Sequence, residues 1–283
     1  MVKKIISIAV YSVRQRAVEP RVLLLFVLMI AFIWNDLSVI GDFSGMMKIK
    51  TNPLIFPFLS SDPVKQLILL SGVVFLFSDA PFINKCQPYV IIRSKRSSWV
   101  LGQILYIIMA SAIYYLILMC ASILILLPNT TFATDGWGKI INTLAQTNAG
   151  AQIHLQFGVS EKITAFYSPF TAFGLSFLLN CSIASFLGLL MFVINLKFNR
   201  MIGLIVGATV LFFDLLTINM LPYKFYHFSP VTLSRLAILD PIGVSTLPDI
   251  SYSFIFFGVS IVLLCALLVI GIKNEPIEIT SEI

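Results

Sequence analysis

The chain has 283 residues, of which 58% are hydrophobic and only 11% are charged. A soluble domain carries about 25% charged residues, so this composition excludes an ordinary soluble globule. Stretches of about 20 residues lack Lys, Arg, Asp and Glu, and a helix of that length crosses ~30 Å of hydrocarbon. These stretches do not alternate in polarity as the strands of an outer-membrane barrel do. The sequence therefore predicts an all-α polytopic membrane protein with a single transmembrane domain over residues 1–283.

Residues 1–20 are predicted to form an N-terminal amphipathic helix at the membrane interface. Apolar residues recur at helical spacing from Val2 to Ala17, and Lys3, Lys4 and Arg14 lie between them. This pattern is typical of a basic helix on a membrane surface. A frayed basic tail that only sets the topology is the alternative.

Six membrane spans are predicted, at about 22–40, 64–79, 99–127, 171–194, 201–221 and 252–272. If the N-terminus is inside, twelve Lys and Arg lie on the inner side, mostly in dense clusters, and seven lie outside. The positive-inside rule then places both termini in the cytoplasm. The formal net charge of +6 is interpreted in the same way, so no nucleic-acid partner is expected.

The second predicted span is short and carries polar residues at both ends. Lys65 and Gln66 stand at its start and Asp79 at its end. We expect these side chains to reach the membrane interfaces by snorkelling.

The segment 80–92, between the second and third spans, is predicted to be a cytoplasmic coupling element. It mixes apolar and charged residues and precedes a basic run. A basic loop on anionic lipid is the simpler interpretation, and an amphipathic element that docks on a cytosolic partner is the sharper one. The residues expected on such a docking surface are Pro81, Phe82, Lys85, Gln87, Tyr89 and Arg93.

The fifth predicted span carries a small and polar stripe made of Gly203, Gly207, Asp214 and Thr217, which share one helix face. The two glycines allow a second backbone to approach closely, and a carboxylate facing lipid would cost several kcal/mol. This face is therefore expected to pack against protein, as a substrate cavity, a dimer contact or a structural contact. Asn180 belongs to a similar stripe on the fourth span.

The two outer loops, 128–170 and 222–251, are too long for simple connectors, so we expect them to hold short helices. The second is rich in aromatic residues and turn formers. It is interpreted as a partly re-entrant or interfacial helical hairpin, with an ordinary ordered loop as the alternative.

The motifs of catalysis and nucleotide binding are missing from the sequence. The chain has two histidines, His154 and His227, and no H-E-x-x-H motif, no G-x-S-x-G elbow and no phosphate-binding loop. We therefore expect no enzyme activity, no metal site and no cofactor bound by this chain. Any uphill transport must draw its energy from another chain or from an ion gradient.

The layout resembles the membrane (permease) subunits of ABC type 2 exporters, especially the stand-alone permeases of Gram-positive bacteria. The resemblance rests on the amphipathic N-terminal segment, the six spans, Pro81 and Phe82 followed by the basic run that ends at Trp99, and the stretch from Phe228 to Ser234. It implies a permease homodimer or heterodimer in the bacterial plasma membrane, paired with separate cytosolic ATPase subunits that bind ATP and Mg. The substrate would be an amphiphilic peptide, antibiotic or lipid. The resemblance also implies that 80–92 is the coupling helix, that the N-terminal helix contacts the ATPase, and that the first and fifth spans meet at the dimer axis.

Two other functions remain open from the sequence. An ion-coupled secondary transporter would use Asp214 as its ion site, because it is the one strong intramembrane carboxylate. A non-transporting antimicrobial sensor or immunity protein would bind its ligand at the outer loops.

Overall fold

The computed structural model of the chain describes residues 2–80, 82, 96–130, 132, 136–198 and 200–274. Over these ranges the secondary structure is helical, apart from two isolated bridges, Thr51–Thr130 and Asp240–Asp249. Five of the described helices are long and apolar enough to cross a membrane: α2 (Pro20–Met47), α6 (Arg96–Leu126), α10 (Pro169–Lys197), α11 (Arg200–Asn219) and α13 (Ile250–Asn274). The all-helical prediction is confirmed, and the five helices are consistent with a multi-pass membrane protein.

The second predicted span corresponds to α4 (Pro63–Phe77), which is apolar but has only 15 residues. At 1.5 Å per residue it is about 22 Å long, shorter than the hydrocarbon core. Every residue of the preceding segment 51–61 is buried, and only α3 (Phe56–Leu59) is helical within it. Protein thus encloses the non-helical part of this segment, which is the condition under which such backbone is tolerated at membrane depth.

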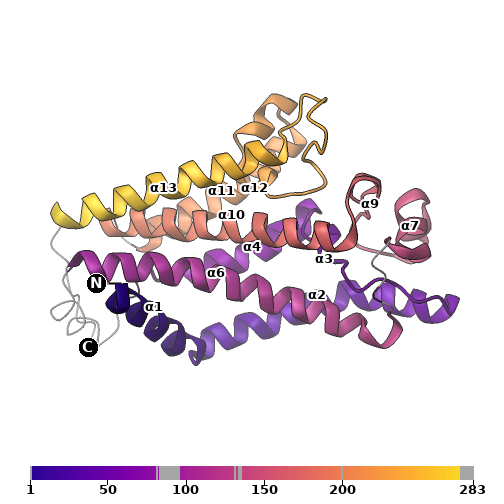
Figure 1. Cartoon of the computed structure of the whole chain (residues 1–283), viewed down its shortest axis with the longest axis horizontal. Helices are drawn as coiled ribbons and strands as arrows, with labels where there is room; N and C mark the ends of the chain where they lie inside the picture. The colour runs from indigo at the N-terminus through magenta and orange to yellow at the C-terminus, as the bar shows by residue number, and fades with distance from the viewer. Residues whose placement is uncertain are drawn as a thin grey trace.

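The long helices run side by side along the length of the molecule (Figure 1). The start of α1 (Val2–Ala17), the start of α6 and the end of α13 lie at one end, which we call the terminal end. The short helices α7 (Gly138–Gln146), α8 (Ala149–Gln152) and α9 (Glu161–Phe166) lie at the opposite end, the loop end. Successive long elements therefore alternate in direction, with α2 running to the loop end and α3 and α4 returning.

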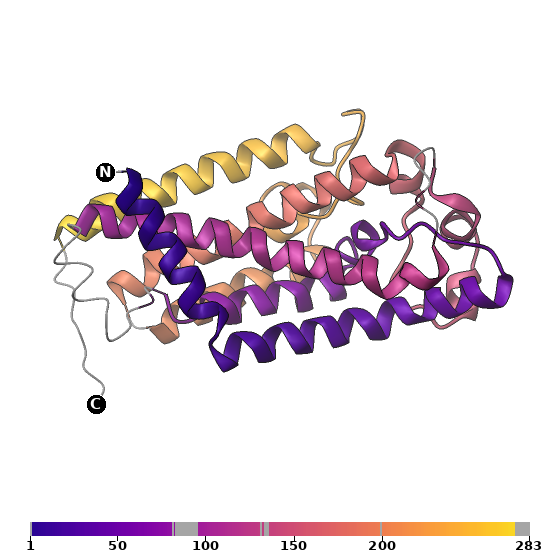
Figure 2. The same cartoon turned by 60° about the horizontal axis from the view of Figure 1, so that its bottom comes forward.

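Helix α1 lies across the first turns of α6 (Figure 2). It buries Ile8, Ala9, Ser12 and Arg16. The approach is close because α6 has glycine at position 102: a Cβ there would lie 2.6 Å from Cγ2 of Ile8. The helix ends at Ala17, and α2 starts with Pro20 in its first turn, where the missing N–H of proline costs nothing.

Helix α10 lies at the centre of the bundle and contacts α4, α6, α11 and α13. A Cβ at Gly188 would lie 2.7 Å from Cγ2 of Ile107 and 2.8 Å from Cδ2 of Phe77, so α4, α6 and α10 meet at van der Waals distance there. Large apolar side chains remain exposed on the outer faces of three helices, as a lipid-facing surface requires: Leu23, Leu24, Val27 and Leu28 on α2, Ile205 and Phe212 on α11, and Val259 and Val262 on α13.

Both long loops at the loop end hold short helices, as the sequence predicts. The first contains η1 (Leu127–Asn129), α7, α8 and α9, and the second contains η2 (Tyr223–His227) and α12 (Pro230–Leu233). Trp137 anchors the first loop: its Nε1 donates to the carbonyl of Tyr167 at 2.8 Å, and its ring packs on Phe58 at a centroid distance of 4.7 Å. In the second loop, residues 230–236 are buried, so this segment enters the protein instead of covering it.

Candidate functional site

Asp214, the mid-span carboxylate on α11, is fully buried and binds the segment around α12. Its Oδ1 accepts hydrogen bonds from Oγ1 of Thr232 at 2.6 Å and from Oγ of Ser229 at 3.2 Å. Its Oδ2 is ion-paired with Nη2 of Arg235. Ser229 and Pro230 start α12 as its N-cap and first residue, and this places Thr232 and Arg235 on the side that faces α11. Asp214 therefore holds the second loop against α11.

The Asp214–Arg235 pair is completely desolvated, since neither side chain is exposed. Burial lowers the pKa of the Arg235 guanidinium from its usual value, and the attraction and hydrogen bond of Asp214 act against this shift. Nε and Nη1 of Arg235 have no hydrogen-bond partner among the described residues. Each charge alone would be costly to bury, so the stability of this pair depends on the distance and orientation that the surrounding residues impose on it.

A second buried ion pair joins α2 and α4: Nζ of Lys65 lies 2.8 Å from Oδ1 of Asp36 and 4.8 Å from the ring centroid of Phe32. The expectation that Lys65 and Gln66 snorkel to an interface is wrong, because Lys65 is only 5% exposed and Gln66 is fully buried. Asp36 compensates the lysine charge inside the protein, so the side chain need not reach water.

Gln66, the residue after Lys65, links α4 to α10 and to the α12 segment through hydrogen bonds. Its Nε2 donates to Oδ1 of Asn180 at 3.0 Å and to Oγ of Ser234 at 2.9 Å, while Nδ2 of Asn180 donates to the carbonyl of Ser176. The Asn180 stripe on α10 thus faces α4 and the α12 segment. We call the whole set the polar layer: Asp36, Lys65, Gln66, Asn180, Asp214, Ser229, Thr232, Ser234 and Arg235.

The remaining residues of the α11 stripe also lie against protein. A Cβ at Gly207 would lie 3.2 Å from Sδ of Met191 on α10 and 3.4 Å from Val74 on α4, and one at Gly203 would overlap the amide of Asn195. Thr217 is buried and donates to the carbonyl of Phe213. These contacts are all within the same chain, while the exposed apolar residues of α11, such as Ile205 and Phe212, lie on its other side.

At the terminal end, the last turn of α1 and the start of α2 bind the end of α4. Oδ2 of Asp79 forms an ion pair with Nη1 of Arg21 at 2.6 Å, and Nη1 of Arg16 lies 3.9 Å from the same oxygen. The guanidinium of Arg16 also lies 4.4 Å from the ring centroid of Phe82, and Phe82 packs edge-on against Tyr106. We call this set (Arg16, Arg21, Asp79, Phe82 and Tyr106) the terminal-end cluster.

The ring of Phe82 is not exposed on the predicted docking surface, because its side chain is 1% exposed. Its role in coupling stays a prediction. Its backbone has φ +52°, an unusual conformation for a bulky residue. The other residues of the predicted surface, Pro81, Lys85, Gln87, Tyr89 and Arg93, lie outside the described residues.

Sequence reasoning missed Arg235, Asp36 and Lys65 as members of a buried site. A signal was present for Arg235: it is a single basic residue in an otherwise apolar and small stretch, as Asp214 is a single acidic residue in its span. A solitary charge of each sign in apolar surroundings is the pattern expected of a buried pair.

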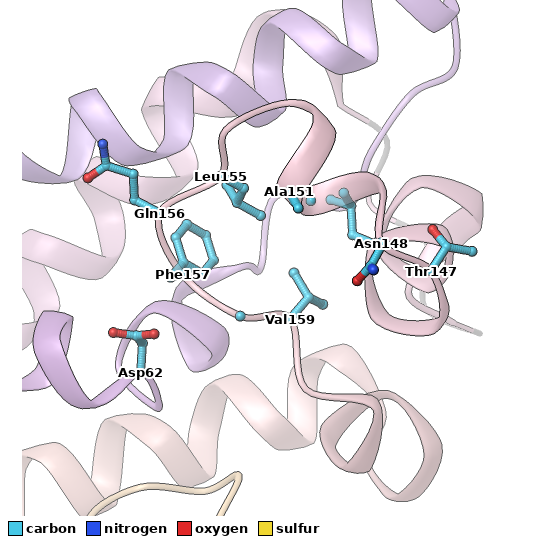
Figure 3. Close-up of a pocket in the computed structure, with 11 residues that line it drawn as sticks. Asp62, Thr147, Asn148, Ala151, Leu155, Gln156, Phe157 and Val159 are labelled. Atoms are coloured by element: carbon cyan, nitrogen blue, oxygen red, sulfur yellow. The ribbon is translucent and has the colours of Figure 1, made fainter. Parts of the chain in front are cut away.

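The loop end contains a pocket of about 470 Å³ between the start of α4 and the first long loop (Figure 3). Asp62 at its base is the N-cap of α4, and its Oδ1 accepts from the backbone N–H groups of Val64 and Lys65. The other residues that line it are Leu144, Thr147, Asn148, Gly150, Ala151, Leu155, Gln156, Phe157, Gly158 and Val159.

Across the part of the chain that the structure describes, no group of three His, Cys, Asp or Glu side chains could hold a metal ion. The chemistry available in the polar layer is that of buried charge and hydrogen bonding between helices. Comparison of the chain with models of known protein families, with curated proteins and with solved structures gives no match.

Proposed function

We propose that the chain is the transmembrane permease subunit of an ATP-driven ABC exporter, which moves or extracts an amphiphilic peptide, antibiotic or lipid. The energy comes from a separate cytosolic ATPase subunit that binds ATP and Mg, and the permease works as a homodimer or heterodimer in the bacterial plasma membrane. The observation that carries this proposal is that α1 contacts both ends of the segment expected to couple to the ATPase.

Helix α4 ends at Phe77 and α6 begins at Arg96, so the expected coupling segment, 80–92, lies between these two helices. Phe82 packs under Arg16 in the last turn of α1. Gly102, in the second turn of α6, packs against Ile8 of the same helix. A displacement of the coupling segment would therefore be transmitted to α1, α4 and α6 together, which is what a coupling element requires.

The proposal includes six spans, with the terminal end in the cytoplasm. Helix α4 and the buried segment 51–61 return the chain from the loop end to the terminal end, and so serve as the short second span. The density of basic residues before α2 and between α4 and α6 supports this orientation. Helix α1 exposes Lys3, Lys4 and Arg14, which suits a basic helix at the cytoplasmic interface.

Helix α4 also connects the polar layer near the loop end with the terminal-end cluster. Its first turn carries Lys65 and Gln66 of the polar layer, and its last turn leads into Asp79 of the terminal-end cluster. Movement at the coupling segment would thus reach the contacts that hold the α12 segment at the loop end. In this proposal Asp214 holds that segment through Arg235.

The test is co-purification of the chain with the ATPase from its native host. Charge reversal at Lys85 and Arg93 (K85E with R93E) should remove most of the bound ATPase, since docking on a basic surface depends on its charge. The matched control is K139E with K224E, two lysines of the loop end, and it should retain the ATPase. The purified chain alone should hydrolyse no ATP. Export that continues in cells depleted of ATP would refute the proposal.

An ion-coupled carrier gives the opposite result in a second assay. Transport that an uncoupler stops at constant ATP, and that Asp214→Asn abolishes in a folded protein, would favour the carrier. Under our proposal, export persists in the presence of the uncoupler as long as ATP is maintained.

A further inference from the structure

We propose that the pocket between α4 and the first long loop binds a small amphiphile that carries a protonated amine. This inference goes beyond the proposed function, because the pocket lies at the loop end and its occupation needs neither an ATPase nor transport. Its volume of about 470 Å³ falls within the 300–1,000 Å³ typical of small-molecule sites.

The walls of the pocket suit the apolar part of such a ligand. Leu144, Leu155, Phe157 and Val159 line it, and Figure 3 shows the side chains of Leu155, Phe157 and Val159 arranged around the same space. The amide of Asn148 lies at one edge of this space. An apolar wall with a few polar groups at its edge is the usual construction of a site for a partly apolar ligand.

The charge of the pocket selects a cation. Asp62 is the sole ionisable residue among the described residues that line it, and its carboxylate lies across from Phe157 (Figure 3). Of its two oxygens, Oδ1 accepts the two N-cap hydrogen bonds, and none of the described hydrogen bonds uses Oδ2. Arg235 is attracted to Asp62, but it is ion-paired with Asp214. The Asp62 charge is thus left largely available to a ligand.

The expected discrimination is modest because Asp62 is half-buried and not fully enclosed. Ion pairs of this kind contribute about 0.2–1 kcal/mol, which corresponds to a preference of at most about fivefold for an amine over its neutral analogue. The preference should weaken as salt is added, since the site is open to solvent.

The experiment uses the full chain in phosphatidylcholine nanodiscs and dansylcadaverine, a fluorophore with a primary amine, as the probe. Its N-acetyl derivative is the uncharged analogue, and empty nanodiscs give the background of membrane partitioning. The wild-type chain should bind the amine about 1.4- to fivefold more tightly than the acetylated probe. Equal affinity for the two probes would overturn the proposal.

Asp62→Asn is the informative variant, because asparagine is as good an N-cap as aspartate and so keeps the start of α4 while removing the charge. It should bind both probes with the same affinity. The matched control is Asp249→Asn, which changes another carboxylate at the loop end that accepts from a helix N–H, that of Tyr252. If D62N keeps the preference for the amine, or D249N loses it, the proposal is wrong.

Ala151→Phe tests the apolar part of the site without removing a buried side chain, since Ala151 is exposed and lines the pocket. It should reduce the binding of both probes several-fold, and unchanged binding of both would place the ligand elsewhere. None of these measurements involves an ATPase, so their failure would leave the proposed export function standing, and failure of the co-purification test would leave this site standing.

Discussion

Arg235 forms an ion pair with Asp214, 21 residues earlier in the chain, and neither side chain is exposed to solvent. The pair joins α11 to a segment that runs from the loop end into the protein. Since the carboxylate also accepts hydrogen bonds from Ser229 and Thr232, the single acidic residue of this helix holds three points of the same segment.

Arg235→Ala should lower the free energy of unfolding by about 3–5 kcal/mol, because it leaves the carboxylate of Asp214 buried without a counter-charge. The double variant Asp214→Leu with Arg235→Met should cost less than Arg235→Ala alone, since it removes both charges and keeps the volume. Thermal and denaturant unfolding in detergent measure both. A double variant that costs as much as Arg235→Ala, or more, would mean that the two side chains are not coupled.

Gly72→Ala should lower the free energy of unfolding by about 1–3 kcal/mol through overpacking, because the added Cβ would overlap Oη of Tyr114 and lie 3.0 Å from Cε of Met29. Tyr114→Phe removes that oxygen at the cost of the hydrogen bond to the carbonyl of Leu69, about 1 kcal/mol. The double variant should therefore be more stable than the sum of the single losses implies. A double-mutant cycle on the unfolding midpoint would reveal purely additive losses if this contact were absent.

Gly102→Ala should loosen α1 from α6, since the new Cβ would lie 2.6 Å from Cγ2 and 2.8 Å from Cβ of Ile8. Faster proteolysis within residues 2–17, with the remaining bundle still protected, is the expected result. Gly258→Ala on α13 is the matched control, because a Cβ there meets no atom within 4 Å. Equal cleavage of the two variants would contradict the close packing of α1.

The loop after α12 should depend on pH through Asp240. Hydrogen bonds from Ser245 and from the backbone of Ile242 hold the pKa of this carboxyl well below its usual range. A depressed pKa in the folded state stabilises the loop above the unfolded pKa of about 3.9, and this contribution is lost as the pH falls through the folded pKa. Amide exchange at 242–245, corrected for its intrinsic rate, should be slow at pH 7 and rise in strong acid.

Asp240→Ala should show that fast exchange already at pH 7, while the amides of α13 keep their protection. Fast exchange of wild-type amides 242–245 at neutral pH would instead show that Asp240 does not order the loop.

The positions of the long helices could be predicted from the sequence because the length of an apolar run is a local property. The predicted span 171–194 lies within α10 (Pro169–Lys197), and 99–127 matches α6 (Arg96–Leu126) to within three residues at each end. That the Asp214 face packs against protein could also be predicted, since facing lipid would be too costly for a carboxylate.

The partners of the buried charges could not be predicted in this way. Asp36 and Lys65 are 29 residues apart on different helices, and only the packing of α2 against α4 brings them together. A hydropathy pattern places such charges near an interface, because it contains no information about a counter-charge inside the protein. The burial of Phe82 could not be predicted either. Its place in a short basic loop suggests exposure, but its ring is buried in the bundle.

The Lys65–Asp36 pair has a consequence for how the chain is made. A lysine at the centre of a membrane helix costs about 2.5–3.5 kcal/mol during insertion. Lys65 lies in the first turn of α4, where the cost is smaller, but this helix has only 15 residues to offset it. Asp36 is synthesised first and offers the counter-charge from α2. In the six-span arrangement proposed above, α2 and α4 would then insert as one hairpin, because Asp36 gains its counter-charge only when Lys65 has been synthesised.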